Sequence, residues 1–175
     1  MVKQVDTQDL KSCDLNSREG SIPSPGTIMD KKIVFQVAVK AIITNDKGEY
    51  LLLRKPDAYK SDIERGMPDK RRWDIAGGRV NAGENVRDAL AREVFEETGL
   101  KVTKVHDIVN VHDAFFLKDV HVIRMYFPVD VEGDIKVSEE HEREAWMNLD
   151  EIRKLYDADE LEGSTTKLFA DLAQW

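Results

Sequence analysis

Three glutamates in this 175-residue sequence have a spacing that places them on one face of a helix. Glu93, Glu96 and Glu97 stand at positions i, i+3 and i+4, so a helix projects their side chains close together. Like charges so arranged cost roughly 0.2–0.5 kcal/mol for each exposed pair, and more where water is excluded. A helix tolerates such a cluster when a cation binds it, and Mg²⁺ takes carboxylate oxygens. The alternative for an acidic run on its own is a solvated helix face.

The residues that precede the three glutamates suit a ligand that carries phosphate. Arg92 can pair with the carboxylates and hold their orientation, and Glu84 lies in the loop just before the helix. Gly77, Gly78 and Gly83 let this loop turn tightly and bring its backbone close to a ligand. A glycine loop, a helix and a metal cluster together suit a diphosphate, because a bound metal neutralises phosphoryl oxygens and activates water.

A helix predicted over residues 86–98 must position the acids. Val86, Leu90 and Val94 recur at every fourth position and form a stripe that can pack on a sheet, and Gly99 provides a stop. The stripe and the acids occupy neighbouring faces, so the helix can be anchored while it presents its carboxylates.

The remaining elements predict an α/β fold. An alternating run at 33–45, a turn at 45–48 and the strand at 49–55 predict a β-hairpin. Further strands are predicted at 73–80, 100–116, 120–131 and 145–149, a long loop at 56–72, and helices at 149–156, opened by Asp150, and 164–175. Because strands and helices interleave while a hairpin is present, we expect a mixed sheet with helices on its faces.

The first 32 residues differ from the rest of the chain. They are polar, lack a sustained period and end in the cluster SIPSPGT. We therefore predict a flexible N-terminal arm over 1–32 and a folded domain over 33–175.

Charge and composition restrict the partners and the location. The net charge of −8 argues against binding to a nucleic-acid polymer or to an anionic membrane. The single cysteine, Cys13, can form neither an internal disulfide nor a cysteine-based zinc site. The apolar run at 37–43 is broken by Lys40 and is shorter than the ~20 residues of a membrane span. With no signal-peptide pattern at the start, these absences predict a cytoplasmic protein, and we expect a monomer or a homodimer.

The complete spacing of residues 78–100 resembles the Nudix box. This motif is written G-x5-E-x7-R-E-U-x-E-E-x-G-U, where U is an aliphatic residue. Every specified position is filled here, by Gly78, Glu84, Arg92, Glu93, Val94, Glu96, Glu97, Gly99 and Leu100. A weaker likeness extends over about 34–156. One departure is Ala76, where many members have proline before the glycine pair.

The resemblance implies a MutT-like pyrophosphohydrolase. Members of the Nudix family form an α/β/α sandwich around a mixed sheet, and most cleave a nucleoside diphosphate linked to another moiety. The cofactor that this implies is Mg²⁺, with Mn²⁺ as the alternative. By this resemblance Glu93, Glu96 and Glu97 would be metal ligands, together with the carbonyl of Gly77. The implied catalytic set is Glu96, Glu93, Arg92 as the residue that orients the carboxylates, Glu84 as its helper, and Glu140.

The general base is open among several glutamates. In some members it belongs to the box, and in others it lies on a loop near the last strands. Glu139, Glu140, Glu142 and Glu144 all lie in the segment SEEHEREAW, and Glu140 resembles the loop acid of many members.

The substrate side is less restricted by the sequence. Arg54 and Arg72 flank the long loop and could contact phosphate, with ordinary surface charge as the alternative, and Gly78 allows close backbone approach to substrate. Some ADP-ribose hydrolases carry a proline, and some dinucleoside polyphosphate hydrolases a tyrosine, at the position of Phe115. The best-fitting small substrate is therefore a (d)NTP or an oxidised nucleotide of the 8-oxo-dGTP type. The alternatives are an ADP-ribose or nucleotide-sugar hydrolase, an RNA-end hydrolase and a non-catalytic nucleotide-binding module.

Overall fold

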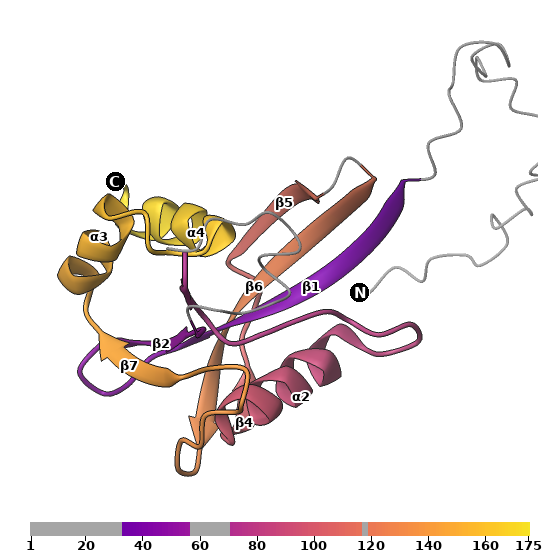
Figure 1. The fold of residues 1–175 in the computed structure, drawn as a ribbon. Helices are drawn as coiled ribbons and strands as arrows, with labels where there is room; N and C mark the ends of the chain where they lie inside the picture. The colour runs from indigo at the N-terminus through magenta and orange to yellow at the C-terminus, as the bar shows by residue number, and fades with distance from the viewer. Residues whose placement is uncertain (1–32, 57–70, 117–118) are drawn as a thin grey trace, which may run out of the picture. The chain divides into compact units, whose positions relative to one another are not determined.

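The computed structural model describes residues 33–56, 71–116 and 119–175. The predicted arm at 1–32, and most of the loop predicted at 56–72, lie outside the described residues. Within the described part, the order of elements is strand, strand, strand, helix, four strands and two helices (Figure 1).

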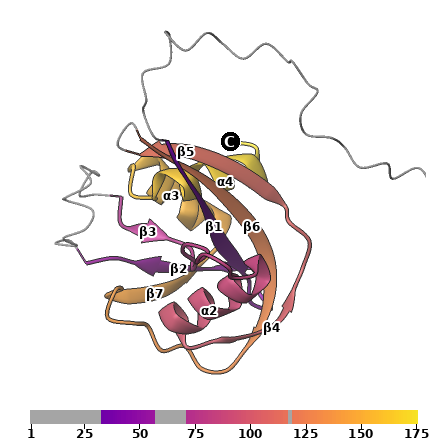
Figure 2. The ribbon, with the colours of Figure 1, turned by 90° about the vertical axis from the view of Figure 1, so that its right-hand side faces the viewer.

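A four-stranded mixed sheet is built around one long strand. Strand β6 (Val120–Glu132) pairs in parallel with β1 (Val34–Ile43) along one edge. Along its other edge it pairs antiparallel with β5 (Asn110–Phe116) and then with β4 (Lys101–Val105). The strand predicted at 100–116 is therefore two strands, because β6 is long enough for both to pair with it in succession (Figure 2).

A separate three-stranded antiparallel sheet has the order β3-β2-β7. It consists of β2 (Tyr50–Arg54), β3 (Trp73–Asp74) and β7 (Arg143–Met147). The predicted hairpin between β1 and β2 is wrong. Only one bridge, from Thr44 just after β1 to Tyr50, joins their ends, and the two strands belong to different sheets.

Both edges of β1 are occupied, which explains why it cannot pair along β2. One edge is the ladder with β6, and the other holds the segment 76–80, which runs antiparallel to β1. Three backbone hydrogen bonds fasten this segment, from Val39 N to Gly78 O, from Ala41 N to Ala76 O and from Val80 N to Val37 O.

Helix α2 (Val86–Thr98) carries the acids and agrees closely with its predicted bounds. Asn85 caps its start by accepting a hydrogen bond from Arg87 N, and Gly99 ends it in the left-handed conformation, with φ of 71°. Leu90 and Val94 are fully buried against the mixed sheet. The predicted stripe therefore anchors this helix.

Two further helices follow the last strand. In α3 (Leu149–Asp157) the cap is Asn148 rather than the predicted Asp150, since Asn148 and Glu151 exchange side-chain-to-backbone hydrogen bonds. Helix α4 (Gly163–Ala173) begins after Glu162, whose carboxylate accepts from the first backbone N–H groups.

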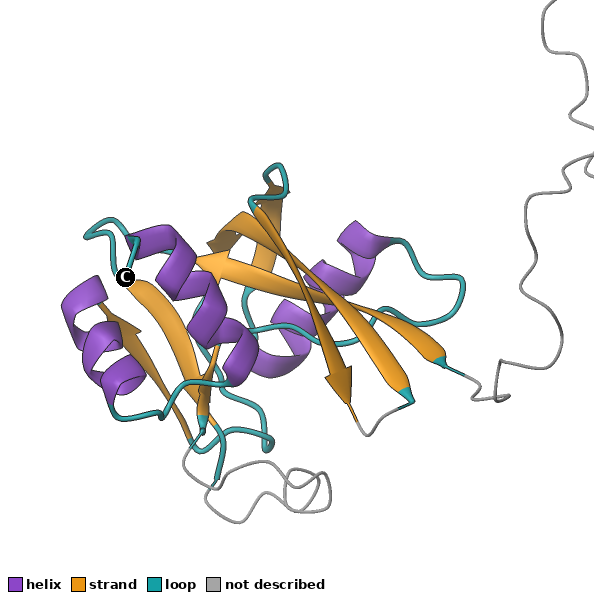
Figure 3. Cartoon of the chain, turned by 90° about the horizontal axis from the view of Figure 1, so that it is seen from above, coloured by secondary structure: helices purple, strands orange, loops and turns teal. Residues whose placement is uncertain are grey.

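Apolar cores form on both faces of the sheets. Alternate residues of β1, including Val39 and Ala41, pack in the core that holds α2, whereas Ile42 joins the core of α3 and α4. The predicted α/β fold with a mixed sheet and helices on its faces is therefore confirmed (Figure 3). None of the helices in the described residues is long and apolar enough to cross a bilayer.

The glycine loop approaches β1 so closely that Gly77 has no room for a side chain. Its φ is +135°, and a Cβ would lie 2.1 Å from the carbonyl oxygen of Val39. Because the obstacle is backbone inside a paired strand, it cannot move aside.

Replacing Gly77→Ala is expected to lower the free energy of unfolding by about 3 kcal/mol or more, since backbone strain and overpacking act together. Gly48→Ala is the matched control, because Gly48 also has a positive φ, of +75°, but nothing within 4 Å of its added Cβ. Its loss should be about 1–2 kcal/mol. Denaturant titration of both variants measures the difference, and equal losses would contradict the close contact described for Gly77.

Candidate active site

One guanidinium organises the acidic face of α2. Arg92 donates to both carboxylate oxygens of Glu84, from Nε at 2.7 Å and from one terminal nitrogen at 2.9 Å. Its other terminal nitrogen donates to Glu93 at 2.7 Å and to Glu96 at 2.9 Å. A fifth hydrogen bond, of 3.1 Å, reaches the carbonyl of Arg79. Because a guanidinium has five N–H donors, this array uses them all and fixes the plane of the group.

Glu84 is held as a carboxylate at the entrance to the helix. Hydrogen bonds from Arg92, together with the backbone N–H of Asn81, lower the pKa of Glu84 to about 2. Hydrogen bonds to Glu84 and Glu93 in turn raise the pKa of Arg92 above its ordinary value. The loop before α2 is thereby tied to the helix by charge as well as by backbone contacts.

Glu93 lies directly against Gly78. A Cβ added to Gly78 would come within 2.3 Å of a carboxylate oxygen of Glu93. Because Gly78 has no side chain, the carboxylate of Glu93 can occupy this position. Glu96 is more open, with 56% of its side chain exposed.

Glu97 faces the glycine loop from the last turn of α2. Its carboxylate accepts the backbone N–H of Gly77 at 2.8 Å. Burial raises the pKa of Glu97 to about 7, and the charges of Asp74 and Glu93 act in the same direction, against the opposing effects of Lys40 and the Gly77 N–H. A cation beside this carboxylate would favour its ionised form.

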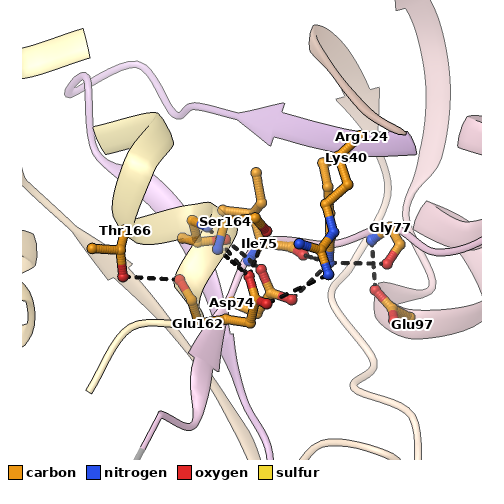
Figure 4. A network of polar contacts seen from close by, with 10 residues as sticks. Lys40, Asp74, Ile75, Gly77, Glu97, Arg124, Glu162, Ser164 and Thr166 are labelled. Carbon is orange, nitrogen blue, oxygen red and sulfur yellow. Dashed lines mark hydrogen bonds and ion pairs between the residues drawn. The ribbon is translucent and has the colours of Figure 1, made fainter. Parts of the chain in front are cut away.

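A buried ion pair behind the loop was not anticipated from the sequence. Lys40 on β1 donates to Asp74 at 2.6 Å, and also to the carbonyls of Ile75 at 3.0 Å and Gly77 at 3.1 Å (Figure 4). Asp74 also accepts from Thr165 at the start of α4. The signal in the sequence was Lys40 itself, a charge inside an otherwise apolar strand.

The charges of this pair stabilise each other. Burial alone would raise the pKa of Asp74, but the charges of Lys40 and Lys55 and the hydrogen bonds from Lys40 and Thr165 hold it well below its usual range. Burial would likewise lower the pKa of Lys40, yet the charge of Asp74, helped by Glu97, raises it.

The segment that carries Glu140 runs beside the end of α2. Backbone N–H groups of Lys136 and Ser138 donate to the carbonyls of Thr98 and Glu97, at 2.7 and 3.0 Å. Glu140 and Glu139 are exposed on the following turn. The structure therefore brings this segment to the same end of the helix as Glu97.

The predicted substrate-side arginines have different surroundings. Arg54 pairs with Glu142, one of the four glutamates considered as general base. Arg72 is 2% exposed, so its side chain lies inside the protein. The neighbouring Arg71 pairs with Asp159 at 2.7 Å.

The donors of this face fit a hard divalent cation. Glu93, Glu96 and Glu97 each use one oxygen in the contacts above, and a carbonyl such as that of Gly77 has two acceptor positions. The set consists of oxygen atoms, which suits Mg²⁺ or Mn²⁺ rather than a soft metal. Within the described residues, no three acidic, histidine or cysteine side chains already converge into a metal cage.

An acid-bearing helix beside a glycine loop, on a mixed sheet, is the arrangement expected of a Nudix domain. A family model described as the NUDIX domain matches residues 34–169. The chain therefore belongs to the Nudix family.

Known relatives span several nucleotide hydrolases. An oxidized purine nucleoside triphosphate hydrolase of Danio rerio is 36% identical over 85 residues, which are 46% of this chain and 52% of that protein. An ADP-ribose pyrophosphatase of Methanocaldococcus jannaschii is 31% identical over 121 residues, 68% of this chain and 65% of that protein. The chain spans about half the length of the oxidized purine nucleoside triphosphate hydrolases that it matches.

The fold has a solved counterpart in a MutT protein from Methanosarcina mazei Go1. The two structures have a TM-score of 0.65 and 30% sequence identity, over 82% of this chain and 96% of that one. A solution structure of the ORF135 protein of E. coli has the same fold, with a TM-score of 0.64, 24% identity, and 81% of this chain and 91% of that one covered.

The array around Arg92 should control the titration of Glu84. In Arg92→Met, the pKa of Glu84 is expected to rise from about 2 toward 4.5, because its strongest donors are lost. Arg92→Lys keeps the charge without the fork and should give an intermediate value. Carbon-detected NMR of the Glu84 carboxyl measures this, with the exposed Glu132 as an internal control. A pKa that stays near 2 in Arg92→Met would refute the assignment.

Gly78→Ala is expected to move Glu93 without unfolding the protein. The added Cβ meets the flexible end of a side chain, so the free energy of unfolding should fall by only about 1 kcal/mol. Displacing one carboxylate should weaken Mn²⁺ binding about tenfold. Gly163→Ala at the start of α4 is the control and should bind Mn²⁺ like the wild type, because its added Cβ makes only an ordinary contact of 3.6 Å with Arg71. Unchanged affinity in Gly78→Ala would show that the Glu93 position does not matter for the metal.

Proposed function

We propose that the protein is a Mg²⁺-dependent pyrophosphohydrolase that cleaves the diphosphate linkage of a nucleoside diphosphate derivative. The observation that carries the proposal is the array in which Arg92 orients Glu84, Glu93 and Glu96 while Glu97 faces the glycine loop. An acidic surface on a helix has no structural need for this arrangement, since lysines would neutralise it more simply.

In this proposal each acid has a distinct task. Glu93, Glu96 and Glu97 hold the cation together with the Gly77 carbonyl, and Mn²⁺ can replace Mg²⁺. When bound, the metal supplies positive charge for the phosphoryl oxygens and lowers the pKa of a water molecule. Arg92 keeps Glu93 and Glu96 turned toward the loop.

Glu84 and Glu140 complete the proposed catalytic set. Glu84 remains ionised and anchors Arg92 through both of its oxygens, so it acts through that arginine. Glu140 is proposed to accept the proton of the attacking water, which its exposure in the segment beside α2 supports. Its assignment over Glu139 is a prediction.

On the substrate side, Gly78 permits close approach of the backbone to the diphosphate, and Arg54 is proposed to contact phosphate at the end of β2. Arg72 lies inside the protein, so the phosphate contact predicted for it is not part of this proposal. We infer a small nucleotide ligand from the acidic charge of the chain, and a cytoplasmic setting from its single cysteine.

The preferred substrate is proposed to be a (d)NTP or an oxidised nucleotide of the 8-oxo-dGTP type. The similarity to oxidized purine nucleoside triphosphate hydrolases supports it. ADP-ribose is the second candidate, because the similarity to an ADP-ribose pyrophosphatase extends over more of the chain.

A product-resolved hydrolysis screen with Mg²⁺ tests the proposal. It covers dNTPs, 8-oxo-dGTP, ADP-ribose, nucleotide sugars and dinucleoside polyphosphates. We expect one class to be cleaved far faster than the rest, and the released phosphates identify the bond. Folded protein that binds nucleotide but cleaves none of these would favour the non-catalytic binding module instead.

Glu97→Gln is expected to abolish the metal-dependent turnover found in this screen, by at least about 10²-fold, while the fold stays intact or becomes slightly more stable. Glutamine retains an oxygen for the Gly77 N–H but lacks the buried charge. Glu132→Gln, at an exposed ion pair with Lys101, is the control and should keep wild-type turnover. Turnover of Glu97→Gln within a few-fold of wild type would remove Glu97 from its proposed role.

A further inference from the structure

The ammonium of Lys40 uses all of its hydrogen-bond donors on groups close to the glycine loop. Its three N–H donors are matched by three acceptors, which are Asp74 and the carbonyls of Ile75 and Gly77. The side chain is only 10% exposed, so little water competes for these donors. Two of the three acceptors are backbone atoms of the segment that leads into the glycine loop.

Residue Gly77 connects this ammonium to the acidic face of α2 through the two peptide units that flank its Cα. Its carbonyl accepts from Lys40, and its N–H donates to Glu97 (Figure 4). A chain of contacts therefore runs from Asp74 through Lys40 and Gly77 to Glu97. The peptide that carries the Gly77 N–H is also held by the bond from Ala41 N to Ala76 O, and Lys40 adds a restraint on the next peptide, which carries the Gly77 carbonyl.

Stability alone is a weak reason for burying this ion pair. Apolar side chains of similar volume at two such positions are often as stable as the charged pair or more so. Ile42, on the same face of β1 as Lys40, already belongs to the apolar core of α3 and α4. The pair also does something that an apolar pair could not, because it offers hydrogen-bond donors to the loop carbonyls.

We propose that Lys40, held in place by Asp74, is a positioning residue: by holding the carbonyl of Gly77 it fixes the backbone of this residue, so that the Gly77 N–H stays on Glu97. The inference rests on the proposed function for its catalytic meaning. Its geometric content, the orientation of the Gly77 backbone, can be measured without substrate.

The decisive comparison uses two uncharged double variants. Lys40→Met/Asp74→Asn removes the three N–H donors of Lys40, while the asparagine oxygen can still accept from Ile75 N and Thr165. Lys40→Gln/Asp74→Asn has nearly the same shape but retains an amide donor. Leu168→Ala, in the core of α3 and α4 and outside the hydrogen bonds to the loop, controls for destabilisation.

Two readouts are taken on the protein without substrate. Mn²⁺ affinity is measured by electron paramagnetic resonance, and hydrogen exchange of the Gly77 amide by NMR. In Lys40→Met/Asp74→Asn we expect Mn²⁺ binding at least about tenfold weaker and faster Gly77 exchange than in wild type. Lys40→Gln/Asp74→Asn should lie between the two, and Leu168→Ala should bind Mn²⁺ like wild type.

Several outcomes would overturn the inference. One is a Mn²⁺ affinity of Lys40→Met/Asp74→Asn within threefold of wild type. Another is the same loss of Mn²⁺ affinity in both double variants, and a third is an equal loss in Leu168→Ala. If Lys40→Met/Asp74→Asn lacks a cooperative unfolding transition, Lys40→Gln/Asp74→Asn is measured instead. Wild-type Mn²⁺ affinity and wild-type Gly77 amide exchange in that variant would then overturn the inference. If wild type binds no Mn²⁺, the proposed function fails, and Gly77 exchange alone decides the role of Lys40.

Discussion

The contact between segment 76–80 and the edge of β1 is the constraint on which the rest of the site depends. Three backbone hydrogen bonds hold the segment, and only glycine fits at position 77. This contact diverts β2 into a second sheet, and it brings the Gly77 N–H to Glu97 and the Gly78 backbone to Glu93. The acids of α2 thus obtain their positions from a strand far away in the sequence.

The parts that could be predicted are those set by local spacing. Helix α2 follows from its apolar stripe and from Gly99, and the pairing of Arg92 with the carboxylates follows from their separations along one helix. The mixed sheet with helices on its faces could be anticipated because strands and helices alternate in the sequence.

The parts that could not be predicted depend on pairs distant in sequence. Lys40 and Asp74 are 34 positions apart, and neither has a pattern that indicates the other. The hairpin was predicted because the turn at 45–48 does form. The strand β1, however, pairs with β6 on one edge and with segment 76–80 on the other. Burial of Arg72 has the same origin, since composition alone does not distinguish a buried arginine from an exposed one.

The two occupied edges of β1 also limit how far the backbone of the site can move when a ligand binds. A strand paired with β6 on one side and with the loop on the other cannot shift without breaking both ladders. The backbone groups near the acids are thus already ordered before any ligand arrives, so ligand binding requires little reorganisation of the backbone. With the backbone fixed in this way, adjustment to a ligand falls to the side chains, above all to the exposed Glu96. Differences in substrate preference between proteins of this fold can then arise from side chains and outer loops while the strand frame is retained.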